Sequence, residues 1–196
     1  MKMAFETLLN SYLEKKVGIS EDFISVALSQ HLQENLIQLL ENGLLRAAGT
    51  GNDGKLSHDK KVRSDTIYWL DKKHNNIHET AFLEQMEGFI AYLNSECFAG
   101  ITSYEFHYSL YEKGSFYVKH LDQFQDNSSR AFSMVSYLNA DWTEADGGEL
   151  LLHQTGNNQK VAPTQGKTVF FKSDELVHEV LVTNVRRMSI AGWLKR

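Results

Sequence analysis

The sequence has very few of the residues that cross-link or interrupt small proteins. Among 196 residues it has one cysteine, Cys97, and one proline, Pro163. A single cysteine excludes an internal disulfide and favours a reducing compartment. We interpret Cys97 as a small buried hydrophobe. The proline lies in the connection 156–166, where we expect it to interrupt no strand.

Long apolar runs and a strong excess of charge are also missing. No run approaches the roughly 20 residues of a membrane-spanning helix, and the first residues lack the apolar segment of a signal peptide. The net charge is −5 at pH 7, and the basic residues gather only in short runs at 59–63 and 72–73. A basic surface for nucleic acid is therefore not expected. We predict a cytoplasmic protein with neither nucleic acid nor membrane as a partner.

The first half of the chain shows helical periodicity. Apolar residues recur at helical spacing near the N-terminus, again between Ser20 and Gly43, and at 79–96. Ser20 is followed by two acidic residues and is the expected N-cap of the second helix. Residues 47–64 hold three glycines and few apolar side chains, which predicts a mobile loop that closes over the substrate as a lid.

From Ile101 onward the pattern changes to short strands separated by turns. Alternating or β-rich runs predict strands at 104–110, 116–120, 130–138, 149–153, 167–171, 177–182 and 187–194. This pattern is typical of two facing antiparallel sheets. We predict a mainly β fold with α, in which a double-stranded β-helix (jelly roll) core over 100–196 is braced by N-terminal helices. Residues 1–60 would form a helical extension and lid within a single domain, 1–196.

Two histidines and one aspartate in the second half have a spacing that suits a metal. His120 and Asp122 are two residues apart, and such residues project to the same side of an extended chain. The third residue, His178, opens another predicted strand. Two imidazoles and one carboxylate can occupy one face of a non-haem Fe(II) ion and leave the opposite face open for dioxygen. An H-x-D tripeptide alone also occurs by chance, but the order of these residues favours an oxygenase.

The last predicted strand places Arg187 and Trp193 on one face, which we expect to border the same cavity. A register slip of one residue would put Arg186 in the place of Arg187. The other histidines lack a paired ligand at metal spacing. We predict surface or packing roles for these residues: His31, His58, His74, His78, His107 and His153.

Longer motifs surround these residues. An aromatic strand, a glycine turn and H-x-D follow one another in residues 108–122, and Tyr-Leu-Asn precedes Asp-Trp at 137–142. Gly-Gly-x-Leu occurs at 147–150, His-Glu-Val at 178–180, and Arg-x-Asp-x-Ile-x-Trp at 63–69. From about Val62 to the C-terminus, the chain resembles the Fe(II)- and 2-oxoglutarate-dependent dioxygenases. Within them it is most similar to the EGL-nine-like prolyl 4-hydroxylase family and its bacterial relatives.

The resemblance implies roles for particular residues. The three predicted ligands would hold Fe(II), with 2-oxoglutarate and O2 at the open positions. Arg187 would bind the distal carboxylate of 2-oxoglutarate, because a guanidinium fork makes two parallel hydrogen bonds to a carboxylate. Tyr137 would be a second donor to that carboxylate, and Tyr111 would reach the metal-bound end. Core packing with satisfied hydroxyl groups is the alternative for both tyrosines.

The resemblance also implies a substrate: a prolyl residue in an exposed protein loop, such as that of a translation factor. Its hydroxylation would release succinate and CO2, with ascorbate as the reductant. Arg63, Asp65 and Trp193 would border the substrate. Trp193 and Leu121 are candidates for the apolar wall around the metal, and packing in the core of their strands is the alternative for both. Two alternatives stay open. One is an oxygenase that acts on a small molecule or another amino-acid side chain, and the other is a cupin-like metal-binding protein without oxygenase activity.

Overall fold

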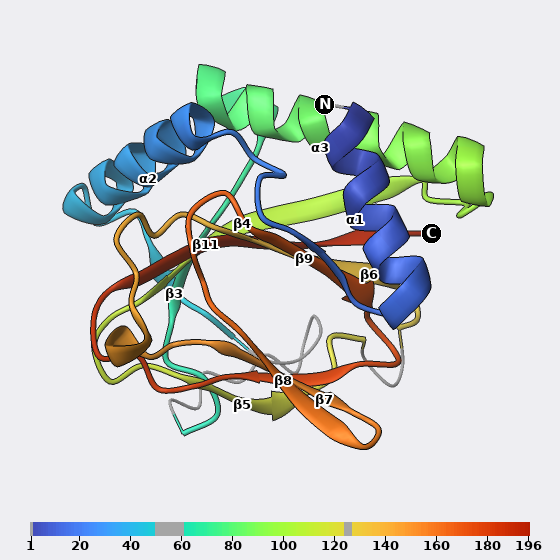
Figure 1. Cartoon of the computed structure of the whole chain (residues 1–196). Helices are drawn as coiled ribbons and strands as arrows, with labels where there is room; N and C mark the ends of the chain where they lie inside the picture. Colours follow the sequence, from blue (N-terminus) through green and yellow to red (C-terminus); the bar gives the residue numbers. More distant parts are fainter. Residues whose placement is uncertain (1, 50–60, 124–126) are drawn as a thin grey trace.

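The computed structural model describes residues 2–49, 61–123 and 127–196, and it places helices over one face of a two-sheet β core (Figure 1). The helices are α1 (Lys2–Lys15), α2 (Val26–Glu41) and α3 (Ile77–Cys97), with 3₁₀ turns η1 (Lys72–His74) and η2 (Glu144–Asp146). The strands are β1 (Gly18–Ser20), β2 (Arg46–Ala47), β3 (Thr66–Trp69), β4 (Ser103–Tyr111), β5 (Tyr117–His120), β6 (Arg130–Tyr137), β7 (Leu150–Gln154), β8 (Asn157–Val161), β9 (Thr168–Lys172), β10 (Val177–Val180) and β11 (Arg187–Lys195).

Within the described residues these strands form two antiparallel sheets. The larger sheet has the order β1-β9-β6-β11-β4-β3-β2, and the smaller sheet has the order β5-β10-β7-β8. The longest pairing joins β11 to β4 from Arg187↔Tyr111 to Lys195↔Ser103. In Figure 1 the larger sheet lies in the middle, with the helices above it and the smaller sheet below it. The predicted mainly β fold, with helices bracing a jelly-roll core, is confirmed.

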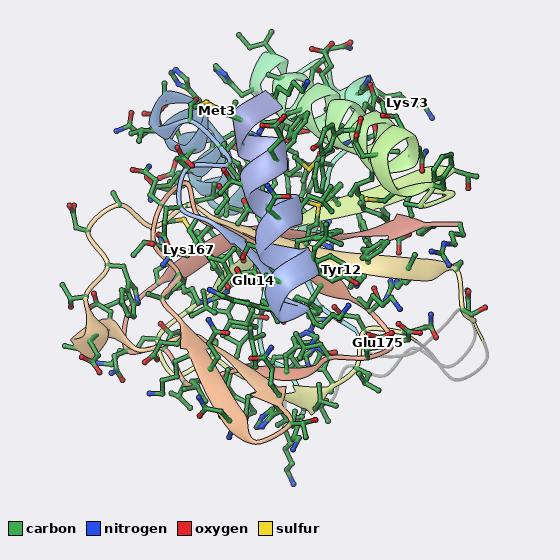
Figure 2. All side chains as sticks on the ribbon, turned by 45° about the vertical axis from the view of Figure 1, so that its right-hand side comes forward. Met3, Tyr12, Glu14, Lys73, Lys167 and Glu175 are labelled. Carbon is green, nitrogen blue, oxygen red and sulfur yellow. The ribbon has the colours of Figure 1, made fainter. Side chains whose placement is uncertain are left out.

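Two apolar cores form because neighbouring residues on a strand point to opposite faces of the sheet. On β9, Phe170 packs under the helices, whereas Phe171 packs between the two sheets. The Phe170 ring lies 5.4 Å from that of Phe89 on α3, and the Phe89 ring lies 5.3 Å from that of Phe5 on α1. Figure 2 shows α1 in front of the molecule, with Met3 near its upper end and Tyr12 toward its lower end. The helices therefore cover the sheet face that lies away from the predicted metal site.

Two expectations about the N-terminal half are wrong. Ser20 does not cap the second helix, because it lies in β1 and pairs with Thr168 of β9. The N-cap is Ser25, whose side chain accepts a hydrogen bond from the backbone N–H of Leu28. Cys97 is exposed rather than buried, because it is the last residue of α3.

The loop predictions were partly wrong. The predicted connection 156–166 contains a strand, β8, whose polar residues pair with β7 from Leu150↔Val161 to Gln154↔Asn157. In the predicted lid 47–64, Ala47 belongs to β2, and residues 50–60 lie outside the described residues. No helix among the described residues is long and apolar enough to span a membrane.

One close approach in the larger sheet depends on glycine. A Cβ atom added to Gly192 on β11 would lie 2.2 Å from Cδ1 of Phe106 and 2.3 Å from the carbonyl oxygen of Glu105.

We expect Gly192→Ala to lower the free energy of unfolding by about 3 kcal/mol or more, because the backbone of β4 would have to move. In the control Gly88→Ala on α3, the new methyl group meets Phe5 at an ordinary 3.5 Å. Gly88→Ala should raise the free energy of unfolding by up to about 1 kcal/mol, because alanine favours a helix more than glycine does. Urea unfolding measures both, and a Gly192→Ala variant as stable as wild type would contradict the packing described.

Candidate active site

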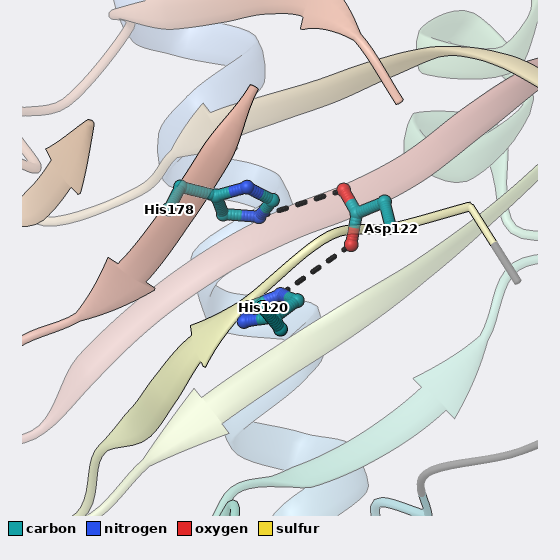
Figure 3. Close-up of side chains that lie close together, drawn as sticks. All are labelled: His120, Asp122 and His178. Atoms are coloured by element: carbon teal, nitrogen blue, oxygen red, sulfur yellow. Dashed lines mark ion pairs between the residues drawn. The ribbon is translucent and has the colours of Figure 1, made fainter. Parts of the chain in front are cut away.

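The three predicted metal ligands come together at the pairing of β5 with β10 (Figure 3). His120 and His178 are directly opposite each other in the register. Asp122 follows the end of β5 and reaches both rings. Its Oδ1 lies 3.4 Å from Nε2 of His120, and its Oδ2 lies 3.5 Å from Nε2 of His178. The ligand atoms of all three lie within 4.8 Å of one another, close enough to share one metal ion.

The surroundings hold the two imidazoles in the orientation that a metal needs. Nδ1 of His120 lies 2.7 Å from the carbonyl oxygen of Val118, and Nδ1 of His178 lies 3.0 Å from that of Leu176. If each Nδ1–H donates to its carbonyl, the lone pair of each Nε2 faces Asp122. Burial lowers the pKa of His178 in spite of the nearby Asp122 carboxylate. Neutral imidazoles and an ionised carboxylate are the states in which these groups bind a metal, so the residues present fit an Fe(II) ion.

A buried cation without a carboxylate partner lies on the other side of the site. Arg187 is 2 % exposed; its Nε donates to the carbonyl oxygen of Gly148 at 2.7 Å and its Nη1 to Oγ of Ser189 at 3.3 Å. No carboxylate among the described residues forms an ion pair with it. The hydroxyl group of Tyr137 is also buried without a hydrogen-bond partner, and its ring lies 5.1 Å from the Arg187 guanidinium carbon. Burying an unpaired charge is costly, so this pair fits the carboxylate of a ligand.

A cavity that is partly open to solvent connects the metal ligands with Arg187. Of the other predicted site residues, Tyr111, Arg63 and Trp193 line it, whereas Tyr137 and Asp65 are not among its lining residues. Leu121 is also not in the lining and is 44 % exposed. The interpretation of Leu121 as a wall of the metal site is therefore wrong, because its side chain points away from the cavity.

Arg63, which lines the cavity, is held in a fixed position. Its Nε and Nη2 donate to the two carboxylate oxygens of Asp65 at 2.8 and 2.7 Å, and its guanidinium carbon lies 4.4 Å from the centroid of the Tyr117 ring. The Tyr117 ring in turn stacks on the His120 ring, with the two ring centroids 3.6 Å apart. Asp65 thus acts on the cavity through Arg63.

Two ring-bearing side chains of this cavity, Tyr117 and His107, were not predicted to belong to it. Tyr117 was missed because it is three residues from His120, a spacing that puts side chains on opposite faces of a regular strand. A register irregularity between β5 and β10 brings both rings to the cavity. His107 was expected to be a surface or packing residue, but it also lines the cavity. Its position on the same face of β4 as Tyr111 was the available signal.

Comparison with known proteins decides the chemistry of this arrangement. The family model of the 2OG-Fe(II) oxygenase superfamily matches residues 106–195, a range that contains the three candidate ligands and Arg187. Residues 106–195 thus have the sequence pattern of a 2OG-Fe(II) oxygenase. The family therefore implies Fe(II) as the metal cofactor and 2-oxoglutarate and O2 as the co-substrates.

Solved structures agree with this oxygenase family. A prolyl-4-hydroxylase of Pseudomonas putida is 29% identical over 98% of both chains, with a TM-score of 0.88. A Trichoplax adhaerens prolyl hydroxylase in complex with a hypoxia inducible factor peptide fragment shares the fold. It is 20% identical over 99% of this chain and 90% of its own, with a TM-score of 0.87. The alpha-ketoglutarate-dependent epimerase SnoN also shares the fold at 14% identity, with coverage of 100% and 84% and a TM-score of 0.67.

We propose that His120, Asp122 and His178 bind the iron of this oxygenase, which leads to a first prediction for the site. His178→Ala should weaken Fe(II) binding more than about 100-fold, which is the upper end of the loss when only an outer-shell partner is removed. The matched control is His153→Ala on the neighbouring strand β7, where His153 pairs with Glu179. Anaerobic titration calorimetry measures both. Wild-type iron affinity in His178→Ala would contradict the ligand assignment.

A second prediction separates two adjacent arginines. We propose that Arg187 binds the distal carboxylate of 2-oxoglutarate, whereas Arg186 forms a surface ion pair with Glu112 at 2.8 Å. Arg187→Lys keeps the charge but loses the planar fork, so 2-oxoglutarate should bind at least about tenfold more weakly. Arg186→Lys should bind it as wild type does. Titration of the iron-loaded enzyme with 2-oxoglutarate tests this, and the reverse order of the two variants would refute the assignment.

Proposed function

We propose that this oxygenase hydroxylates a prolyl residue in a peptide or protein segment. The observation that carries the proposal is the likeness to the Pseudomonas putida prolyl-4-hydroxylase, because it extends over 98% of both chains. The overall reaction would insert one oxygen atom of O2 into a C–H bond of the substrate. The other oxygen atom would enter succinate as 2-oxoglutarate loses CO2.

The residues of the cavity divide this task. His120, Asp122 and His178 would hold Fe(II), which together with O2 and 2-oxoglutarate supplies the oxidising chemistry. Arg187 and the Tyr137 hydroxyl would bind the distal carboxylate of 2-oxoglutarate, because both are buried and lack an acidic partner. Each would fix the position of the co-substrate, which is the main contribution of a protein to such a reaction.

Tyr111 supports the same pocket from β4. It pairs with Arg187 in the register, and the Arg187 guanidinium carbon lies 4.9 Å from its ring centroid. Burial raises the pKa of its hydroxyl group well above the ordinary value, so the hydroxyl stays protonated and can donate. We assign Tyr111 to the metal-proximal carboxylate of 2-oxoglutarate.

Two further residues, Arg63 and Trp193, line the cavity, and Arg63 is fixed by Asp65. We assign these three residues to the substrate side of the site. We further propose a translation-factor loop as the substrate, ascorbate as the reductant, and the cytoplasm as the location.

Mass spectrometry of host-cell proteins tests the proposal directly. Cell extract would be incubated with enzyme, Fe(II), 2-oxoglutarate and ascorbate, and in parallel with the His178→Ala variant. We expect prolyl residues that gain one oxygen atom only with the wild-type enzyme. Enzyme-dependent oxidation confined to another side chain, or to a small molecule in the extract, would overturn the prolyl assignment and favour an alternative substrate.

A further inference from the structure

A continuous row of planar side chains crosses four adjacent strands of the larger sheet. Trp69 on β3, His107 on β4, Trp193 on β11 and Arg130 at the start of β6 form this row, which we call the planar ladder. Ring centroids lie 4.9 Å apart for Trp69 and His107, and 5.5 Å apart for His107 and Trp193. The guanidinium carbon of Arg130 lies 3.4 Å from the centroid of the Trp193 ring.

The planar ladder leads from the surface to a metal ligand. Trp69 at its outer end is 47 % exposed. At the inner end Arg130 donates to the backbone carbonyl oxygen of Asp122 at 3.2 Å, and its charge is balanced by Glu105 at 2.9 Å. His107 and Trp193, in the middle, line the cavity. A substrate bound in the cavity would therefore lie beside these two rings.

His107 is unusual among the members of the planar ladder, because it is polar, buried and unpaired. Its Nδ1 is sealed from solvent and meets no hydrogen-bond partner among the described residues. Burial, followed by the charge of Arg63, lowers its pKa to about 4, so the ring is neutral at pH 7. A phenylalanine or leucine would fill the gap between two indoles without leaving a buried nitrogen unpaired.

The neutral ring has one N–H and one lone pair, and the surroundings select between its nitrogens. An N–H sealed without an acceptor is rarer in proteins than an unused lone pair. The proton therefore belongs on Nε2, the nitrogen left to face the cavity that the ring lines. The nitrogen that this ring can offer to a ligand is therefore a donor.

A prolyl segment is complementary to such a donor. Proline has no backbone N–H, and its own and the preceding carbonyl groups are acceptors. We propose that His107 is a specificity-determining residue whose Nε2–H donates to a backbone carbonyl beside the hydroxylated prolyl residue. The proposal rests on the prolyl substrate proposed above, and it adds the group that recognises it.

Two substitutions separate hydrogen bonding from packing. His107→Phe keeps a flat ring between Trp69 and Trp193 but removes the donor, whereas His107→Gln keeps an N–H donor and removes the ring. The probe is a pool of capped peptides, each with one central proline between randomised flanking residues. Measured quantities are KM and kcat for prolyl oxidation, together with 2-oxoglutarate consumption in the absence of peptide.

We expect His107→Phe to raise the peptide KM about tenfold, since a buried carbonyl would lose its donor. Peptide-free 2-oxoglutarate consumption should stay unchanged, and His107→Gln should recover most of the lost affinity. An unchanged KM in His107→Phe, or an equal loss of peptide-free consumption, would overturn the role of His107 alone. If the wild-type enzyme consumes 2-oxoglutarate but oxidises no proline in the pool, the prolyl function itself fails, and the proposal for His107 fails with it.

Discussion

The antiparallel pairing of β5 with β10 is the constraint on which the whole site depends. It sets His120 opposite His178, and the carbonyl oxygens of Val118 and Leu176 then orient both rings. Asp122 reaches both imidazoles only because β5 ends at His120 and the chain bends. A shift of one residue in this register would turn one imidazole to the outer face of the sheet. The metal site is therefore a consequence of strand register as much as of ligand identity.

The second constraint is the burial of a cation. Arg187 lies at the start of β11, where Gly148 accepts from its Nε and leaves room for its side chain. A Cβ atom at Gly148 would lie 3.0 Å from Cδ of Arg187, and its φ of +73° also favours glycine. In the proposed role of Arg187, the carboxylate of 2-oxoglutarate offsets the cost of burying this unpaired charge. The site would then be organised for an anionic co-substrate before that co-substrate arrives.

Regular alternation explains what the sequence could and could not predict. Strand β4 alternates from Tyr104 to Leu110, and β6 and β11 are β-rich runs, so their ranges and the face of Arg187 were predictable from residue pattern. Tyr117 was not, because an irregular register in β5 brings residues three apart to one cavity. Strand β8 was missed because its residues are mostly polar and its pairing with β7 depends on backbone hydrogen bonds. Ser20 resembled an N-cap, but the distant strand β9 recruits it into β1.

The two sheets have separate tasks in the site. The smaller sheet supplies both histidines of the proposed iron site, from β5 and β10, whereas the larger sheet supplies Arg187 and the planar ladder. Changes at Trp69 or His107 should therefore affect a bound substrate more than the proposed metal ligands, as expected when function depends on a site rather than on the fold. Among the described residues, Arg130 is one link between the two tasks, because it stacks on Trp193 and donates to the backbone carbonyl oxygen of Asp122.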